Sequence, residues 1–297
     1  MDIQRRDAAL VSLYGLALGD ALGSQFFVPG NLAGYARREV PPGPWEWTDD
    51  TQMACGIWLV LDQAGHVDQD LLARTFADLH DSHRGYGPST NRILRLIREG
   101  GDWRELAVGA FDGKGSWGNG AAMRIAPLGV WFHDDLERLA AEAVKSAEVT
   151  HTHPEAISGG VAVAVAAAVA ATEESLSPGR FLDRVLEFLP PGFVRDGVEE
   201  ARRLLTIDEP GLASSVLGNG HQIAAHDTVP FCLWAAAKDL DDYERAFWRT
   251  AAAGGDVDTN CAIVGGIVAA RTGLAALPTG WLENLEALPA PIPNAHS

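Results

Sequence analysis

The sequence contains few cysteines and few basic residues, and each shortage excludes a class of protein. Three cysteines among 297 residues, Cys55, Cys232 and Cys261, cannot build a disulfide framework and show no CxxC spacing, so we expect a reduced, intracellular setting. Lys and Arg number 23 against 40 Asp and Glu, which gives a formal net charge of -17. Because binding to duplex nucleic acid or to an anionic membrane surface depends on Lys and Arg, we expect neither partner.

The sequence also lacks a long hydrophobic run. Its most apolar stretch, residues 156–171, is uncharged but shorter than the roughly 20 residues that cross a bilayer. Ser158, Gly159, Gly160 and the many alanines of this stretch suit a helix packed inside a protein. The N-terminus carries an early Asp and no apolar segment typical of a secretory signal. We therefore expect a soluble, cytoplasmic protein without membrane contact, and we favour a monomer.

Strand signals are weak, and helical periodicity dominates. The alternating Val and Ala residues at 161–165 are followed by a run of alanines that favours a helix. No strand–helix unit repeats and no GxGxxG follows a strand, which disfavours a doubly wound sheet. The apolar spacing predicts helices at residues 4–24, 49–64, 68–82, 88–99, 119–131, 134–149, 154–172, 179–189, 194–206, 228–238, 241–253 and 258–272.

No low-complexity linker or internal repeat divides the chain. We therefore predict an all-α fold in which residues 1–297 form a single compact orthogonal bundle of many helices. The last ten or so residues are rich in proline, and we expect them to fray.

Two acidic clusters at opposite ends of the chain each precede an apolar helical segment. The first is Thr48-Asp49-Asp50, and the second is Asp256-Val257-Asp258-Thr259. Helix capping explains either cluster alone about as well as a functional role does, because Asp and Thr are preferred at N-caps. However, adjacent carboxylates repel each other and gain little from sharing one cap. The glycine pair Gly254-Gly255 also permits a close backbone approach that capping does not need.

Taken together, the two clusters favour a hard cation. All candidate ligands are oxygen atoms, with neither Cys nor His between them, which selects Mg²⁺, Mn²⁺ or Ca²⁺ over zinc. Four carboxylates exceed the usual one or two for a single Mg²⁺, so we predict two ions about 3.5–4 Å apart. This prediction requires the two ends of the chain to meet in space. Without ions, the apposed carboxylates would repel and some of their pKa values would rise.

A glycine-rich segment at residues 115–120 is a third candidate feature. It precedes a predicted helix that starts near Ala121, and N–H groups freed by glycines at a helix start can bind an anion such as a diphosphate. A turn without a ligand is the alternative, and for this segment alone it would be the preferred interpretation.

These features resemble the hallmarks of the ADP-ribosylglycohydrolase family, whose members are all-helical and hold two metal ions. A TDDT motif near the start and a GGDxDT motif near the end, in that order, form a specific pair. The resemblance rests on GLALGDALGS (15–24), WTDDTQMA (47–54), RGYGPST (84–90), GSWGNGAAMRIAPLG (115–129), VTHTHPEA (149–156) and GGDVDTN (254–260). It implies a hydrolase with two Mg²⁺ ions, or Mn²⁺ as a substitute. Its substrate would be ADP-ribose linked to a protein side chain or a small conjugate.

The resemblance also implies roles for the acidic residues. Thr48, Asp49 and Asp50 would hold one ion together with Asp258, and Asp256, Asp258 and Thr259 would hold the second ion. Asp49 and Asp50 are the candidates for the catalytic base that activates a water. Asp20, within the first predicted helix, would orient the metal site. The metal-ligand set is thus Thr48, Asp49, Asp50, Asp256, Asp258 and Thr259.

A second set of residues is implied in binding the substrate. The glycine-rich loop would bind the diphosphate and a ribose, and two aromatic residues would stack against adenine. As isolated residues, these aromatics would more often be ordinary core or surface side chains, and the loop at 84–87 a simple turn. The implied substrate-binding residues are Gly115, Ser116, Trp117, Gly118, Asn119, Gly120, Phe111, Tyr86, Gly87 and His151.

One departure from the family pattern concerns a glutamate that usually follows GDxxG and belongs to a mobile flap. In this sequence Phe27 stands at that position, and Glu39 or Glu46 from the same loop are candidates to replace it. The alternative function is therefore an ADP-ribose-binding module with little or no hydrolase activity. The linkage that would be cleaved stays open among arginine, serine, O-acetyl and other conjugates.

Overall fold

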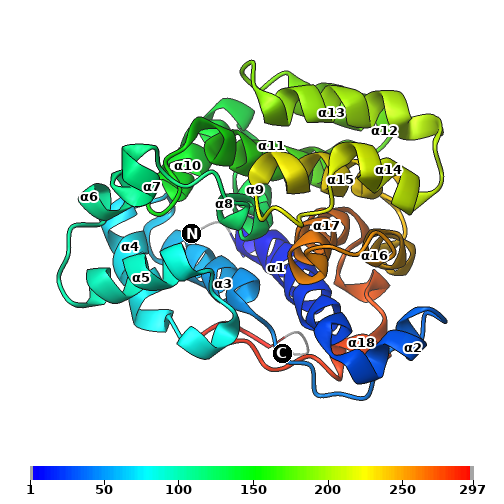
Figure 1. The fold of residues 1–297 in the computed structure, drawn as a ribbon, viewed down its shortest axis with the longest axis horizontal. Coiled ribbons are helices and arrows are strands. Elements are labelled where there is room, and N and C mark those ends of the chain that lie inside the picture. Colours follow the sequence, from blue (N-terminus) through cyan, green and yellow to red (C-terminus); the bar gives the residue numbers. More distant parts are fainter. Residues whose placement is uncertain (1–2, 295–297) are drawn as a thin grey trace.

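The computed structural model describes residues 3–294, and this part of the chain contains 18 α-helices and no β-strand (Figure 1). The predicted all-α fold is therefore confirmed. The helices are α1 (Ile3–Ser24), α2 (Leu32–Tyr35), α3 (Asp49–Ala64), α4 (Gln69–Leu79), α5 (Pro88–Arg98), α6 (Trp103–Val108), α7 (Ala110–Gly113), α8 (Gly120–Met123), α9 (Ala126–Trp131), α10 (Leu136–Glu148), α11 (Pro154–Thr172), α12 (Pro178–Leu186), α13 (Phe193–Arg203), α14 (Pro210–Leu217), α15 (Ala225–Lys238), α16 (Tyr243–Ala251), α17 (Val257–Thr272) and α18 (Thr279–Leu282).

Two helices from opposite ends of the chain, α1 and α17, lie side by side at the centre of the molecule (Figure 1). Glycines allow this contact. A Cβ atom added at Gly19 would lie 2.1 Å from the carbonyl oxygen of Cys261, and one at Gly15 would lie 2.5 Å from that of Gly265. Because no side chain separates the two backbones, residues near the C-terminal end of α1 come close to the first turn of α17.

We expect the substitution Gly19→Ala to destabilise the protein by about 1–3 kcal/mol, because the new methyl group must force two packed helices apart. Urea unfolding measures the change in the free energy of unfolding. Gly30→Ala is the control, since a Cβ atom at Gly30 meets no atom within 4 Å. If both variants unfold at the same urea concentration, the close approach of α1 and α17 is contradicted.

Several helix boundaries differ from the prediction. The predicted helix at 119–131 is wrong as one element, because it divides into α8 and α9. Pro127 lies in the first turn of α9 and has no N–H to donate to the carbonyl of Met123, so one continuous helix would lose that bond. The short helices α2, α6, α7, α14 and α18 were not predicted, since they are too short to show a periodic apolar pattern.

The C-terminal segment packs against the fold as far as it is described. Leu288 and Ile292 are buried, and the hydroxyl of Tyr14 on α1 donates a 2.7 Å hydrogen bond to the carbonyl of Pro293. The expected fraying therefore does not hold for residues 288–294, because these apolar side chains have a surface to cover. Residues 295–297 lie outside the described residues.

The apolar helix α11 is long and hydrophobic enough to cross a membrane by length and composition alone. In this fold, 78% of its most apolar window is buried inside the protein, where α11 packs against α9, α10, α15 and α17. Its alanine-rich sequence is accounted for by this tight packing.

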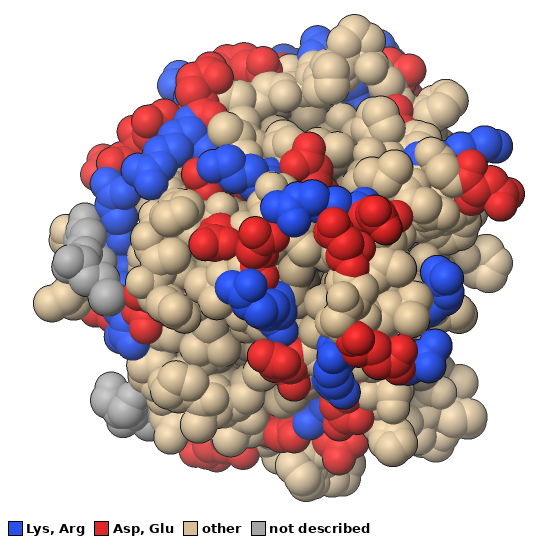
Figure 2. All heavy atoms as spheres, turned by 90° about the vertical axis from the view of Figure 1, so that its left-hand side faces the viewer, with Lys and Arg blue, Asp and Glu red and all other residues tan. Residues whose placement is uncertain are grey.

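Charged side chains of both signs alternate over the face formed by α4, α5 and α6 (Figure 2). Arg104, for example, lies 2.9 Å from Asp70, and Arg95 lies 3.5 Å from Glu99. On this face the acidic excess of the chain is therefore interrupted by basic side chains.

Candidate functional site

A cleft of about 450 Å³ opens where the two ends of the chain meet. It brings together most of the site residues that the sequence predicts, although they come from segments more than 200 positions apart. The predicted residues that line it are Asp49, Asp50, Gly87, Phe111, Ser116, Trp117, Gly118, Asn119, Gly120, His151, Asp256, Asp258 and Thr259.

Three predicted residues do not line this cleft. Tyr86 is buried, and its hydroxyl donates a 2.8 Å hydrogen bond to Oε1 of Gln52, so its side chain supports the loop from within. Gly115 is buried behind the loop, with φ 74°, and a Cβ atom there would lie 2.1 Å from Oγ1 of Thr152. Thr48 lies beside the acidic cluster, and its hydroxyl is engaged with two carboxylates.

The acidic cluster forms at the meeting point of three helices. One carboxylate oxygen from each of Asp20 on α1, Asp50 on α3 and Asp258 on α17 lies within 4.8 Å of the others. Asp20 and Asp50 are buried, and Asp258 is half-buried. Three carboxylates this close can hold a metal ion, and the juxtaposition that the sequence analysis required is present.

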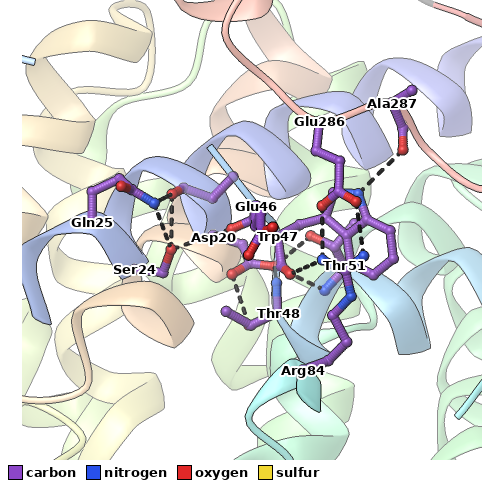
Figure 3. Close-up of polar contacts among 11 residues, drawn as sticks. Asp20, Ser24, Gln25, Glu46, Trp47, Thr48, Thr51, Arg84, Glu286 and Ala287 are labelled. Atoms are coloured by element: carbon purple, nitrogen blue, oxygen red, sulfur yellow. Dashed lines mark hydrogen bonds and ion pairs between the residues drawn. The ribbon is translucent and has the colours of Figure 1, made fainter. Parts of the chain in front are cut away.

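Asp20 fixes the start of α3 against α1 (Figure 3). Its Oδ2 accepts hydrogen bonds from the backbone N–H groups of Thr48 (2.9 Å) and Thr51 (3.1 Å). The Thr51 hydroxyl donates to the same oxygen at 2.5 Å, and the Thr48 hydroxyl donates to Oδ1 at 2.7 Å. Asp20 thus caps α3 from another helix and sets the direction of Asp49 and Asp50.

Helix capping does not explain the two acidic clusters. Thr48 and Asp256 stand at the N-cap positions of α3 and α17, yet neither side chain makes a capping hydrogen bond. The Thr48 hydroxyl lies instead 2.9 Å from Oδ2 of Asp50, and Oδ2 of Asp256 accepts a 2.7 Å hydrogen bond from the Asn119 amide. The carboxylates and hydroxyls of the clusters point toward one another and the cleft.

Burial and mutual repulsion raise the pKa values of the clustered carboxyl groups. The pKa of Asp49 rises to about 7, first because burial disfavours the charged form and then because of the charge of Asp20. The pKa values of Asp50 and Asp258 rise well above the ordinary value for the same two kinds of reason. Burial also raises the pKa of Asp256, although the hydrogen bond from Asn119 opposes this shift.

The residues present fit a divalent cation. Oδ1 of Asp50 is buried and has no hydrogen-bond partner within the described residues. A buried, unpaired carboxylate oxygen is costly in the folded protein, and a hard cation would both pair with it and neutralise the repulsion among its neighbours. All the converging ligand atoms are oxygens, as Mg²⁺ or Mn²⁺ prefers.

The glycine-rich loop is joined to the acidic cluster through Asn119. The amide of Asn119 donates to Asp256 and also, at 3.1 Å, to the hydroxyl of Thr228 on α15. An isolated bridge between Gly118 and Ala224 holds the loop from the other side. The predicted helix after the loop is only the single turn α8, so the loop is not followed directly by the N-terminus of a long helix.

The cleft also has an aromatic part. Phe111 and Trp117 line it and expose 56% and 49% of their surface, and the Trp117 ring packs edge-to-face against the rings of His153 and His226. Phe111 adopts φ 52° and Ile223, on the facing wall, also adopts φ 52°. Such left-handed conformations are strained for large or β-branched residues. Ile223 was missed by the sequence analysis because no motif marks a residue held in this conformation.

A second missed feature clamps the loops around the cluster. Arg84 pairs with Glu286 in two hydrogen bonds of 2.7 and 2.8 Å and donates a third, at 2.9 Å, to the carbonyl of Trp47 (Figure 3). Its guanidinium also lies 3.5 Å from the centre of the Trp47 ring. The C-terminal segment therefore holds the loop before Thr48 and the loop after Arg84 in register.

The loop that follows α1 supplies no carboxylate to the cleft. Phe27 is exposed, and Glu39 pairs with Arg37 at 2.8 Å on the surface. Within the described chain, neither Glu39 nor Glu46 lines the cleft, so the structure does not support either as a replacement for the family glutamate.

The fold and the site define an all-α protein with a cleft that is lined by clustered carboxylates, a glycine-rich loop and two exposed aromatic side chains. The sequence model of the family described as ADP-ribosylglycohydrolase matches residues 1–294. The chain therefore belongs to the ADP-ribosylglycohydrolase family, and the resemblance found in the sequence is confirmed.

Individual relatives cover nearly the whole chain. An uncharacterized protein of Archaeoglobus fulgidus is 31% identical over 290 residues, which cover 92% of this chain and 90% of that protein. ADP-ribosylhydrolase ARH3 of Gallus gallus is 30% identical, with 87% and 77% covered. ADP-ribosylarginine hydrolase Tri1 of Serratia proteamaculans is 26% identical, with 94% and 75% covered. A solved ADP-ribosylglycohydrolase-related protein complex is similar with a TM-score of 0.66 and 26% identity, over 96% of this chain and 94% of that chain.

Proposed function

We propose that the protein is a magnesium-dependent ADP-ribosyl hydrolase that cleaves the glycosidic bond between ADP-ribose and a protein side chain or small conjugate. Family membership and relatives named as ADP-ribosyl hydrolases support the enzyme class. The observation that carries the metal dependence is the convergence of Asp20, Asp50 and Asp258 around a buried, unpaired oxygen. We propose two Mg²⁺ ions, with Mn²⁺ as a substitute.

The ligands would come from both ends of the chain. Thr48, Asp49 and Asp50 would hold one ion together with Asp258, and Asp256, Asp258 and Thr259 would hold the second. The short distance between the carboxylates of Asp50 and Asp258 supports this assignment, while Asp20 is largely engaged in holding α3. When bound, the cation supplies a positive charge that permits these carboxylates to be ionised together and lowers the pKa of water.

Residues of the chain would stabilise the transition state and accept the proton of the attacking water. Hydrolysis of a ribosyl bond passes through an oxocarbenium-like state, in which positive charge develops at the anomeric carbon as the bond to the leaving group lengthens. The carboxylates beside the cleft stabilise that charge. A water attacks the anomeric carbon and gives one proton to Asp49 or Asp50, while the leaving nitrogen or oxygen departs with the electrons of the broken bond and takes up a proton from that carboxyl group or from solvent. Asp49 is a candidate for this role because it lines the cleft beside Asp50 and Asp258.

Different parts of the cleft would recognise different parts of the substrate. The apolar faces of Phe111 and Trp117 suit a stacked adenine. The glycine-rich loop between them and the acidic cluster suits the diphosphate. This arrangement would place the distal ribose at the carboxylates and fix it for attack.

The alternative is a module that binds ADP-ribose without cleaving it. The specific observation behind it is that Phe27 is exposed and that neither Glu39 nor Glu46 lines the cleft. Such a module would retain the aromatic face and the loop, and its affinity for ADP-ribose would be indistinguishable from that of the enzyme. Only turnover separates the two functions.

The deciding experiment offers the purified protein a panel of arginine-linked and serine-linked ADP-ribosyl peptides together with O-acetyl-ADP-ribose. Released ADP-ribose is quantified by chromatography with Mg²⁺, with Mn²⁺ and with excess chelator. We expect release from at least one linkage with either metal and none with chelator. Calorimetric binding of ADP-ribose without release from any substrate would establish the binding module, and release in chelator would refute the metal dependence.

A further inference from the structure

A chain of buried polar groups runs beneath the glycine-rich loop. Arg124, which follows α8, is fully buried. Its Nη2 donates hydrogen bonds to the carbonyl of Ser146 (2.9 Å) and to Oγ1 of Thr150 (3.0 Å). Burial lowers the pKa of Arg124 to about 9, so the guanidinium remains charged at neutral pH. This places a desolvated cation directly behind the Thr150 hydroxyl.

The Thr150 hydroxyl has one proton to donate, and its surroundings determine where that proton goes. The side chain is buried, and its oxygen already accepts from Arg124. Nδ1 of His151 lies 2.7 Å away, and it is the one acceptor that the described structure offers this hydroxyl. Because a buried hydroxyl donates to the acceptor within reach, Thr150 donates to Nδ1.

A neutral imidazole that accepts at Nδ1 carries its own proton on Nε2. His151 is neutral at physiological pH, because burial and the nearby charge of Arg124 lower its pKa to about 3. The hydrogen bond from Thr150 therefore selects one of two tautomers.

The protonated nitrogen of His151 faces the glycine-rich loop and the cleft. A Cβ atom added at Gly120 would lie 2.8 Å from Nε2, and one at Gly118 would lie 3.2 Å from it. His151 is almost completely buried and lines the cleft, yet its Nε2 has no hydrogen-bond partner in the described part of the chain. Glycines at both positions leave the edge of the imidazole accessible beneath the loop.

We propose that Thr150, polarised by Arg124, is a positioning residue that holds the proton of His151 on Nε2, so that the imidazole presents a fixed neutral N–H donor to an oxygen of a nucleotide diphosphate or sugar bound under the loop. The identity of that ligand rests on the proposed function, whereas the position of the proton does not. A neutral donor serves this place well, because it adds hydrogen bonding without placing another charge beside the acidic cluster.

The first test locates the proton without any ligand. Nitrogen-15 NMR of histidine side chains in the metal-free protein distinguishes the two tautomers, and the His151→Gln variant assigns the signals among the nine histidines. We expect the proton on Nε2 and the shift of a hydrogen-bonded acceptor at Nδ1. Thr150→Val, which keeps the shape but removes the hydroxyl, should abolish the acceptor shift, and Thr150→Ser should restore it. A proton on Nδ1 in the wild type, or an unchanged Thr150→Val spectrum, would overturn the proposal.

The second test measures binding of ADP-ribose by calorimetry. We expect Thr150→Val to raise the Kd about tenfold, because the donor loses its fixed orientation, and Thr150→Ser to stay within about twofold of the wild type. Equal melting temperatures of the two variants would show that folding is not the cause. A wild-type Kd in Thr150→Val would refute the positioning role. If the wild type itself binds no ADP-ribose, the proposed function fails, while the NMR spectrum still decides the tautomer.

Discussion

Asp258→Asn is expected to abolish the release of ADP-ribose and, at the same time, to stabilise the metal-free protein. The change removes one negative charge from three converging carboxylates while retaining an oxygen that can accept the 2.8 Å hydrogen bond from the Thr259 backbone. We expect kcat to fall roughly 10³-fold or more, because cation binding and charge stabilisation are both lost. We expect the melting temperature in chelator to rise by a few degrees, because carboxylate repulsion is relieved.

The opposite directions of these two effects make the prediction specific. A substitution that merely damaged the fold would lower both activity and stability. Asp196→Asn, on the exposed face of α13, is the matched control. It should leave turnover unchanged and lower the melting temperature only slightly, because Asp196 lies in the first turn of that helix. An Asp258→Asn variant that keeps wild-type turnover, or that melts at a lower temperature than the wild type in chelator, would contradict the role of Asp258 in a cation site.

The sequence predicted best those features that depend on residues close together in the chain, such as the helix bounds. The helix expected at 49–64 is α3, residue for residue, and the one expected at 258–272 begins one residue earlier as α17. In both cases apolar residues at helical spacing begin directly after a polar cluster, so the cluster marks the start of the helix. The acidic composition of the clusters also indicated an oxygen-ligand site before any geometry was known.

The convergence of the clusters could not be read from local pattern. It depends on the glycine contact at Gly19, which brings α1 against α17. It also depends on Asp20, for which the sequence predicted a role beside the metal site but not the hydrogen bonds to the start of α3. Burial of a carboxylate is a property of the assembled fold. Its pKa therefore becomes predictable only when the distances to the other carboxylates are known.

The order of the C-terminal segment also could not be predicted from its local sequence. Its prolines and polar residues indicated a frayed end, yet Ile292 is buried and the carbonyl of Pro293 accepts a hydrogen bond from the Tyr14 hydroxyl. A proline-rich segment is irregular in its own conformation, but the surface it meets determines whether it is ordered. Similarly, Ile223 adopts its left-handed conformation between a local turn bond to the carbonyl of Gly220 (2.7 Å) and a long-range bond from the N–H of Asn119 (3.3 Å), and the long-range bond cannot be read from the local sequence.

The stability of the metal-free wild type is expected to fall as pH rises from about 4 to about 7, and Mg²⁺ should reverse this trend. The pKa of Asp49 rises from 3.8 to about 7 on folding, so between these values the folded state binds more protons than the unfolded state. Stability is therefore greatest below the unfolded pKa and is lost as pH passes through the folded pKa. His151 opposes this trend, because burial lowers its pKa to about 3 and its contribution to stability therefore grows as pH rises toward 6.5. The pKa values of Asp20, Asp50, Asp256 and Asp258 are all raised like that of Asp49, so the carboxyl groups decide the sign. At about 1.36 kcal/mol for each pKa unit, the net loss should reach a few kcal/mol.

Calorimetric melting at about pH 5 and about pH 8, in chelator and in Mg²⁺, measures both parts of this prediction. Mg²⁺ should raise the melting temperature more at the higher pH, because protons no longer compete for the carboxylates and binding to the folded state alone stabilises it. Asp258→Asn should lose most of this response, whereas Asp196→Asn should keep it. A metal-free wild type that becomes more stable across this pH range would show that the carboxylates are ionised without strain and do not need a cation.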